Sequence, residues 1–190
     1  MVKQLKILAI VGSPRLEGNT NYLVDQALVE AAKLGTQTEK IILHQYKVNP
    51  CLGHDDCASF ESCQQKDDAN WILERFREAD GVILATPVYY YNVSAQMKTF
   101  IDRNYFFYTH NQGYKAKVVG IIVVAGEEGI EDTLHTLGKF ANELGVEEDK
   151  RFVVSGYADK LGEAQQNLPL VKAAQELGRH MIQTLKEQSK

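Results

Sequence analysis

The sequence predicts an α/β fold in which a doubly wound, five-stranded parallel sheet is covered by helices on both faces. Short runs of Val, Ile and Leu alternate along the chain with longer segments whose apolar residues recur at helical spacing. The short runs are apolar almost throughout, which is typical of strands buried on both faces. A chain of 190 residues is long enough for one such core, so we expect a single domain over residues 1–190.

Five strands and five helices are expected in strict alternation. The strands are expected at residues 5–11, 40–44, 81–86, 117–125 and 151–155. The helices are expected from apolar faces within residues 23–34, 71–79, 93–101, 134–144 and 171–185. Gly35 and Gly145 follow the first and fourth helices, where a left-handed cap residue is expected. A long irregular stretch remains at residues 45–66.

Charge and hydropathy exclude several classes of partner. A net charge of −4 provides no basic surface for nucleic acid or for an anionic membrane. The chain contains no apolar run long enough to cross a bilayer, and its first apolar run lacks the cleavage site of a signal peptide. We therefore expect a cytoplasmic protein that binds small molecules and neither nucleic acid nor membranes.

A polar turn, GSPRLEGNT, joins the first expected strand to the first helix. It places five residues where free N–H groups and the positive end of the helix dipole favour an anion: Ser13, Arg15, Gly18, Asn19 and Thr20. Hydroxyl, amide and guanidinium groups can all donate to phosphate oxygens. The glycine pattern of dinucleotide-binding turns and the lysine of the P-loop are absent, so we expect a terminal phosphate rather than NAD or ATP. A solvated turn capped by Ser13 or Asn19 is the alternative.

The segment TPVYYYNVS follows the third expected strand and reaches the same end of the sheet. We expect Pro87 to stop the strand and Asn92 or Ser94 to cap the next helix. Backbone N–H groups from Val88 to Asn92 are placed to reach the polar edge of a ring. Three consecutive tyrosines offer apolar faces suited to a flat heteroaromatic ring, although we expect at least one at the surface or in an interface: Tyr89, Tyr90 and Tyr91.

These two motifs carry a family resemblance. GSPR followed by GNT, together with TPVYYYNVSAQMKTFIDR, resembles the flavodoxin-like NAD(P)H-dependent FMN reductases and the related iron-sulfur flavoproteins. The resemblance extends through Ser155 and implies the flavodoxin-like strand order 2-1-3-4-5. It also implies FMN, with the residues of the first turn on the phosphate and Pro87 to Asn92 beside the isoalloxazine, and a homodimer or tetramer.

The loop after the fourth expected strand, AGEEGIED, would complete such a site. Ala125, Gly126 and Gly129 leave room for close approach of a ring or ribityl chain. Glu127 and Glu128 are expected to favour the helix dipole and to have no chemical role.

The activity that the resemblance implies needs no catalytic side chain, because the flavin accepts hydride at N5 and passes electrons on. NAD(P)H would be the donor, and free flavin, a quinone or another small molecule the acceptor. The alternative is a non-catalytic electron carrier, with FMN and with or without an iron-sulfur cluster, that shuttles electrons between proteins. The aromatic segment at residues 104–115 is expected either on the substrate side of the flavin or in a subunit interface.

The three cysteines of the chain lie close together with one histidine: Cys51, His54, Cys57 and Cys63. The iron-sulfur flavoproteins show a compact four-cysteine pattern in this loop, and here His54 occupies the second position. The set would suit a [4Fe-4S] cluster with one histidine ligand, or structural zinc. A loop of free thiols without metal is the third reading.

Two other classes with this architecture lack their key residues here. A response regulator needs an aspartate where Thr86 and Pro87 follow the third strand. A low-molecular-weight tyrosine phosphatase needs a cysteine in the first turn, which has none.

Overall fold

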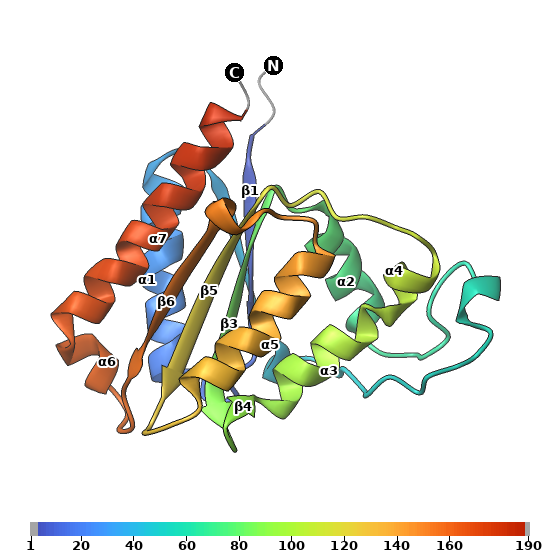
Figure 1. The fold of residues 1–190 in the computed structure, drawn as a ribbon, viewed down its shortest axis with the longest axis horizontal. Helices are drawn as coiled ribbons and strands as arrows, with labels where there is room; N and C mark the ends of the chain where they lie inside the picture. Colours follow the sequence, from blue (N-terminus) through green and yellow to red (C-terminus); the bar gives the residue numbers. More distant parts are fainter. Residues whose placement is uncertain (1–3, 189–190) are drawn as a thin grey trace.

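A parallel sheet runs through the middle of the molecule, with helices on both sides (Figure 1). The structure is a computed structural model and describes residues 4–188. The parallel strands are β1 (Lys6–Val11), β2 (Gln37–Ile42), β3 (Gly81–Tyr89), β5 (Val118–Ala125) and β6 (Arg151–Tyr157). Their order is β2-β1-β3-β5-β6, which confirms the expected order when the parallel strands are counted along the chain. A two-residue strand, β4 (Asn92–Val93), pairs antiparallel with the end of β3.

Each face of the sheet is covered by its own helices. The helices α1 (Asn19–Lys33) and α7 (Leu168–Glu187) bury one face, and the helices α2 (Ala69–Glu78), α3 (Ala95–Arg103) and α5 (Ile130–Glu143) bury the other. Their apolar stripes and the continuous apolar strands form two core clusters, one on each side of the sheet. This confirms the predicted doubly wound α/β class.

Shorter elements join the main ones. They are α4 (Tyr105–Thr109), α6 (Glu163–Gln166) and the 3₁₀ turns η1 (Leu43–Gln45), η2 (Cys57–Ser59) and η3 (Glu148–Lys150). Gly35 and Gly145 have positive φ after α1 and α5, as predicted for cap residues. Within residues 4–188, no helix has both the length and the hydropathy needed to cross a membrane.

Three expectations about individual elements were wrong: the bounds of the second strand, the burial of the first residue of the second helical face, and the end of the third strand. The second strand begins at Gln37 and ends at Ile42, because it is a polar edge strand that pairs with β1 and places Glu39 2.7 Å from Lys6. The residues that form this strand are set by its pairing with β1 and are not marked by a continuous apolar run. The apolar face expected within residues 71–79 begins at Trp71, but this side chain is 37% exposed and packs edge-on against Tyr46.

Pro87 does not stop the third strand, which continues to Tyr89. The N–H of Gly12 donates to the carbonyl of Ala85, so Ala85 and, two residues further, Pro87 direct their backbone polar groups toward β1. Strand β1 has already ended at Val11, so no ladder hydrogen bond is lost at Pro87. The opening beside the end of β3 is where the candidate site lies.

The two ends of the described chain lie together, away from that opening. Figure 1 shows the start of β1 and the end of α7 side by side at one end of the sheet. The carboxyl ends of the parallel strands, with β4, lie at the opposite end.

Candidate functional site

A crevice at the carboxyl ends of the strands collects the loops that follow β1, β3, β5 and β6. Its inner cavity, of about 280 Å³, brings together most of the residues predicted for a cofactor: Ser13, Arg15, Gly18, Asn19, Thr20, Pro87, Val88, Tyr89 and Gly126. An outer cavity of about 400 Å³ shares Val88 and Gly126 with it and is also lined by Tyr90 and Tyr91. The two cavities therefore adjoin and form one elongated site.

Two of the predicted cofactor residues line neither cavity. Ala125 is buried, and its carbonyl accepts the N–H of Ala158, which ties the loop after β6 to the end of β5. Asn92 forms the β4 pairing, and its side chain accepts the N–H of Val93. In this structure both residues form hydrogen bonds within the loops and strand ends that surround the crevice.

The turn after β1 is held by its own hydrogen bonds. The buried Ser13 hydroxyl accepts the N–H of Arg15 at 3.2 Å, and the Arg15 carbonyl accepts the N–H of Gly18 at 3.0 Å. A Cβ on Gly18 would lie 2.9 Å from the Cβ of Arg15, so the chain folds back here only with glycine. The Asn21 amide also donates to the Arg15 carbonyl, at 2.7 Å.

The N-terminus of α1 opens onto the inner cavity without a side-chain cap. Its N-cap is Gly18, which makes no capping bond, so the capped-turn alternative with Ser13 or Asn19 is wrong. The first-turn N–H groups of a helix have no partners within the helix, and here no side chain caps them. Together with the helix dipole they favour an anion at this end of the crevice.

Asn19 has a different role from the one its position suggested. Its amide nitrogen donates to the carbonyls of Ala158 at 3.1 Å and Lys160 at 2.9 Å, and its amide oxygen accepts the N–H of Ala164 at 3.2 Å. The side chain therefore links the turn after β1 to the loop after β6. Its hydrogen-bonding groups are occupied by the protein.

The loop after β6 lines the inner cavity, which the sequence did not reveal. Ala158 and Asp159 lie there, and the Asp159 carboxylate oxygen would be 3.1 Å from a Cβ on Gly126. No motif marks this loop. The rule that ligands bind beyond the carboxyl ends of parallel strands is the signal that would have included it.

The outer cavity is bordered by a strained hairpin. Tyr89 pairs with Asn92, and the two turn residues have positive φ, 47° at Tyr90 and 65° at Tyr91. Two-residue hairpin turns with this backbone usually contain glycine or asparagine. Tyrosine in the left-handed region costs about 1–3 kcal/mol per residue, and such strain is concentrated at functional sites. Tyr90 is 99% exposed, which confirms that at least one tyrosine lies at the surface.

Two fully buried hydroxyls hold this hairpin against the turn after β1. The Thr86 hydroxyl donates to the Pro87 carbonyl at 2.8 Å and accepts the N–H of Ser94 at 3.1 Å. The Ser94 hydroxyl donates to the Gly12 carbonyl at 2.7 Å and accepts the N–H of Met97, which caps α3. Of the two expected caps, Ser94 is therefore the one that is used.

The start of α5 supports the hairpin from the other side. Gly129 has φ +89°, and a Cβ there would lie 2.5 Å from the Cα of Tyr91. Glu127 and Glu128 line the outer cavity, while the acidic residues of the first helical turn are Glu131 and Asp132. Glu127 and Glu128 therefore lie just before the N-cap, outside the first turn, and their expected effect on the helix dipole stays a prediction. They give the mouth of the crevice a negative charge.

The cysteine loop is not arranged as a metal centre. Cys51, Cys57 and Cys63 are free thiols, and nowhere in residues 4–188 do three His, Cys, Asp or Glu side chains gather as a metal-binding group. Burial, and then the neighbouring Cys51 and Cys63, raise the pKa of the Cys57 thiol. The fourth expected ligand, His54, is half-buried, and its carbonyl accepts the N–H of Cys57.

A buried ion pair anchors this loop instead. Arg103, at the end of α3, lies 2.5 Å from the carboxylate of Asp67, and both side chains are shielded from solvent. The same guanidinium donates to the Asn49 carbonyl and lies 3.4 Å from the sulfur of Cys63. Burial alone would raise the pKa of Asp67, but hydrogen bonds from Arg103 and from backbone N–H groups outweigh it and lower the pKa.

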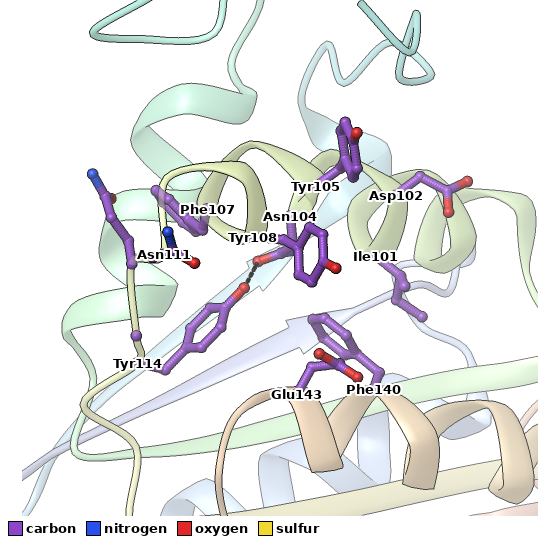
Figure 2. A pocket seen from close by; sticks show the side chains of 12 residues that line it. Ile101, Asp102, Asn104, Tyr105, Phe107, Tyr108, Asn111, Tyr114, Phe140 and Glu143 are labelled. Atoms are coloured by element: carbon purple, nitrogen blue, oxygen red, sulfur yellow. Dashed lines mark hydrogen bonds between the residues drawn. The ribbon is translucent and has the colours of Figure 1, made fainter. Parts of the chain in front are cut away.

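The aromatic segment at residues 104–115 does not line the crevice. It forms α4 and contributes to a separate pocket, together with the ends of α3 and α5 (Figure 2). The ring nitrogens of His110 lie 2.8 Å from the carbonyl oxygens of Phe60 and Phe106, a structural role. None of the segment's residues lines the inner or the outer cavity, and the two expected positions, on the substrate side of the flavin or in a subunit interface, stay predictions.

Comparisons with known proteins agree with the geometry. A family model described as NADPH-dependent FMN reductase matches residues 5–158. An iron-sulfur flavoprotein of Archaeoglobus fulgidus is 44% identical over 120 residues, which are 63% of this chain and 54% of the relative. An iron-sulfur flavoprotein of Methanosarcina thermophila is 34% identical over 135 residues, 70% of this chain and 71% of the relative.

This chain is similar in fold to solved structures. A structure of RosB with bound 8-demethyl-8-formylriboflavin-5'-phosphate has a TM-score of 0.73 at 20% identity, covering 96% of this chain and 81% of that one. This chain spans about half the length of two of its curated relatives: 54% of the Archaeoglobus fulgidus protein and 52% of an iron-sulfur flavoprotein of Methanocaldococcus jannaschii.

Proposed function

Because the chain belongs to the NADPH-dependent FMN reductase family, we propose that its crevice binds FMN and that the protein is an NAD(P)H-dependent oxidoreductase. The proposed acceptors are free flavin, a quinone or another small molecule. The observation that supports this best is the joining of the two cavities at Val88 and Gly126. One elongated ligand with a phosphate at one end and a flat ring at the other would fill both.

The inner cavity has the donors that a phosphate requires. Ser13 and Thr20 offer hydroxyls, Arg15 is exposed with no ion pair among the described residues, and α1 presents its uncapped N-terminus. A phosphate dianion would be stabilised there by charge-assisted hydrogen bonds. Asp159 carries the wrong charge for phosphate but is suited to accept hydrogen bonds from the hydroxyls of a ribityl chain.

The outer cavity has the shape and surface that a ring requires. Val88 and the tyrosines of the hairpin offer apolar surface, and Gly126 leaves the approach open. Bound FMN would supply hydride acceptance at N5. The chain would position the ring against the hairpin, shield one of its faces and leave the other open to donor and acceptor in turn.

An electron carrier is the second candidate, and the names of the iron-sulfur flavoprotein relatives favour it. The cysteine loop does not present a metal-binding group in the described residues. A [4Fe-4S] cluster or zinc at Cys51, His54, Cys57 and Cys63 remains a prediction, as does a homodimer or tetramer.

The proposal is tested with purified protein reconstituted with FMN. We expect flavin absorption to remain after desalting, and NADH or NADPH to be consumed when menadione or free FMN is the acceptor. A colourless protein that takes up no FMN would contradict the cofactor assignment. Bound flavin without turnover would favour the carrier, and iron and zinc analysis of the same sample tests the cysteine loop.

A further inference from the structure

A pocket of about 550 Å³ lies on the α5 side of the sheet, away from the crevice. Figure 2 shows its walls, which come from the end of α3, from α4, from the segment at residues 111–114 and from the last turns of α5. None of its lining residues lines the inner or the outer cavity. Its volume is in the range of small-molecule sites.

Five of the twelve residues that line this pocket are aromatic. Phe107 and Phe140 are buried at its base, Tyr114 is half-buried at one side, and Tyr105 and Tyr108 are exposed at its mouth. The rings of Tyr105 and Tyr108 stack with centroids 6.0 Å apart. Tyr108 is 69% exposed, so an aromatic face remains open to a ligand.

Two polar side chains of the wall, Tyr114 and Asn104, are already paired. The Tyr114 hydroxyl donates to the Asn104 amide oxygen at 2.9 Å, the contact drawn in Figure 2. The Asn104 amide nitrogen donates to the Phe100 carbonyl at 2.8 Å. This part of the wall is therefore held in place without a ligand, and the ring faces and the charges remain open for recognition.

The charges that line the pocket are all negative. Asp102 and Glu143 line it, and no Lys, Arg or His is among its lining residues. Asp102 is paired with Lys98 on the outside of α3. Glu143 forms no ion pair within residues 4–188. The pKa of Tyr114 is raised, first by burial and second by the negative charge of Glu143. The guanidinium of Arg77 contacts the Phe107 ring, but Glu74 and Glu78 neutralise it.

We propose that this pocket binds a small organic cation, an ammonium group on an apolar body. Aromatic faces attract cations through their quadrupole, and a carboxylate without a basic partner adds to that attraction. A neutral ligand would gain only from the apolar area, and an anion would be repelled by Glu143. This site is independent of the proposed flavin site, since α5 separates Gly129 at the crevice from Glu143 at the pocket by about 20 Å.

The test uses the protein saturated with FMN, so that the crevice is occupied, and follows backbone amides by NMR. The probe is benzyltrimethylammonium, compared with neutral benzyl alcohol and anionic benzenesulfonate. We expect the cation to shift the amides of Tyr108, Asn111 and Glu143, with affinity about fivefold or more above that of benzyl alcohol. Benzenesulfonate is expected to leave these amides unchanged.

Two substitutions at exposed positions separate charge from packing. Glu143→Gln is expected to weaken binding of the cation about threefold to tenfold and to leave benzyl alcohol unaffected. Tyr108→Leu is expected to weaken binding of the cation by a similar factor, because it removes an aromatic ring face. The matched control is Glu131→Gln, a carboxylate at the other end of the same helix, which is expected to bind the cation as the wild type does.

Equal affinity for the cation and the alcohol, or a cation affinity unchanged by Glu143→Gln, would overturn the proposal. So would shifts confined to the crevice. A dimeric or tetrameric mass in solution with pocket amides that respond to no probe would assign this face to self-association instead.

Discussion

Replacing Asn19 by alanine tests whether this residue positions the crevice or binds the cofactor directly. In the structure its side chain makes three hydrogen bonds, at 2.9, 3.1 and 3.2 Å, that join the turn after β1 to the loop after β6. A direct phosphate ligand would leave its amide nitrogen unpaired in the absence of phosphate. The structural role therefore predicts a loss of stability in the protein without FMN.

The size of the loss follows from the three bonds. A hydrogen bond of this kind contributes about 0.5–1.5 kcal/mol net, and three of them at partly exposed positions give about 2–4 kcal/mol. Urea unfolding of the FMN-free protein, followed by circular dichroism, measures this difference directly. We expect the midpoint to fall with the slope unchanged.

Thr20→Val is the matched comparison, because Thr20 is the next residue and lines the inner cavity. We expect this variant to keep the wild-type unfolding free energy within about 1 kcal/mol and to bind FMN about tenfold or more weakly. If Asn19→Ala instead unfolds at the wild-type midpoint and loses FMN affinity as Thr20→Val does, the positioning role is refuted.

Three further predictions concern the crevice and the cysteine loop. Gly129→Ala is expected to lower FMN affinity about tenfold in a fluorescence titration, because a methyl group would lie 2.5 Å from the Cα of Tyr91; unchanged affinity would show that the hairpin yields freely. Asp67 has a lowered pKa when folded, so its contribution to stability is present at neutral pH and is lost as pH falls from about 5 through that pKa; urea midpoints should decline more steeply on acidification in the wild type than in Asp67→Asn. Glu127→Gln combined with Glu128→Gln should raise kcat/KM for anionic ferricyanide about twofold to fivefold at low salt and leave neutral menadione unchanged, and an equal gain for both acceptors would rule out an electrostatic cause.

The buried strands and main helices could be predicted because burial on both faces leaves a strong mark in the sequence. Runs such as the one that forms β5 are apolar at every position. The second strand was misplaced because its edge position is satisfied by polar residues such as Glu39. The continuation of β3 through Pro87 was missed because it depends on where a neighbouring strand ends, which local sequence does not contain.

The candidate site was predicted best where a motif follows a strand directly. The turn after β1 and the tyrosine run after β3 do meet at one crevice. The contribution of Asp159 was missed because its loop has no motif, and the role of Asn19 depends on contacts with residues about 140 positions away. The positive φ of Tyr90 and Tyr91 contradicts residue preferences, so only the structure reveals the tight hairpin.

The position of the two chain ends has a practical consequence for electrochemistry. Because β1 begins and α7 ends at the side opposite the crevice, a tether attached beyond either end would hold the molecule with its mouth facing the solution (Figure 1). Immobilised in this way on an electrode, the protein would present the crevice to dissolved mediators and keep it away from the metal surface. Its currents would then report exchange with diffusing acceptors and not direct contact with the electrode.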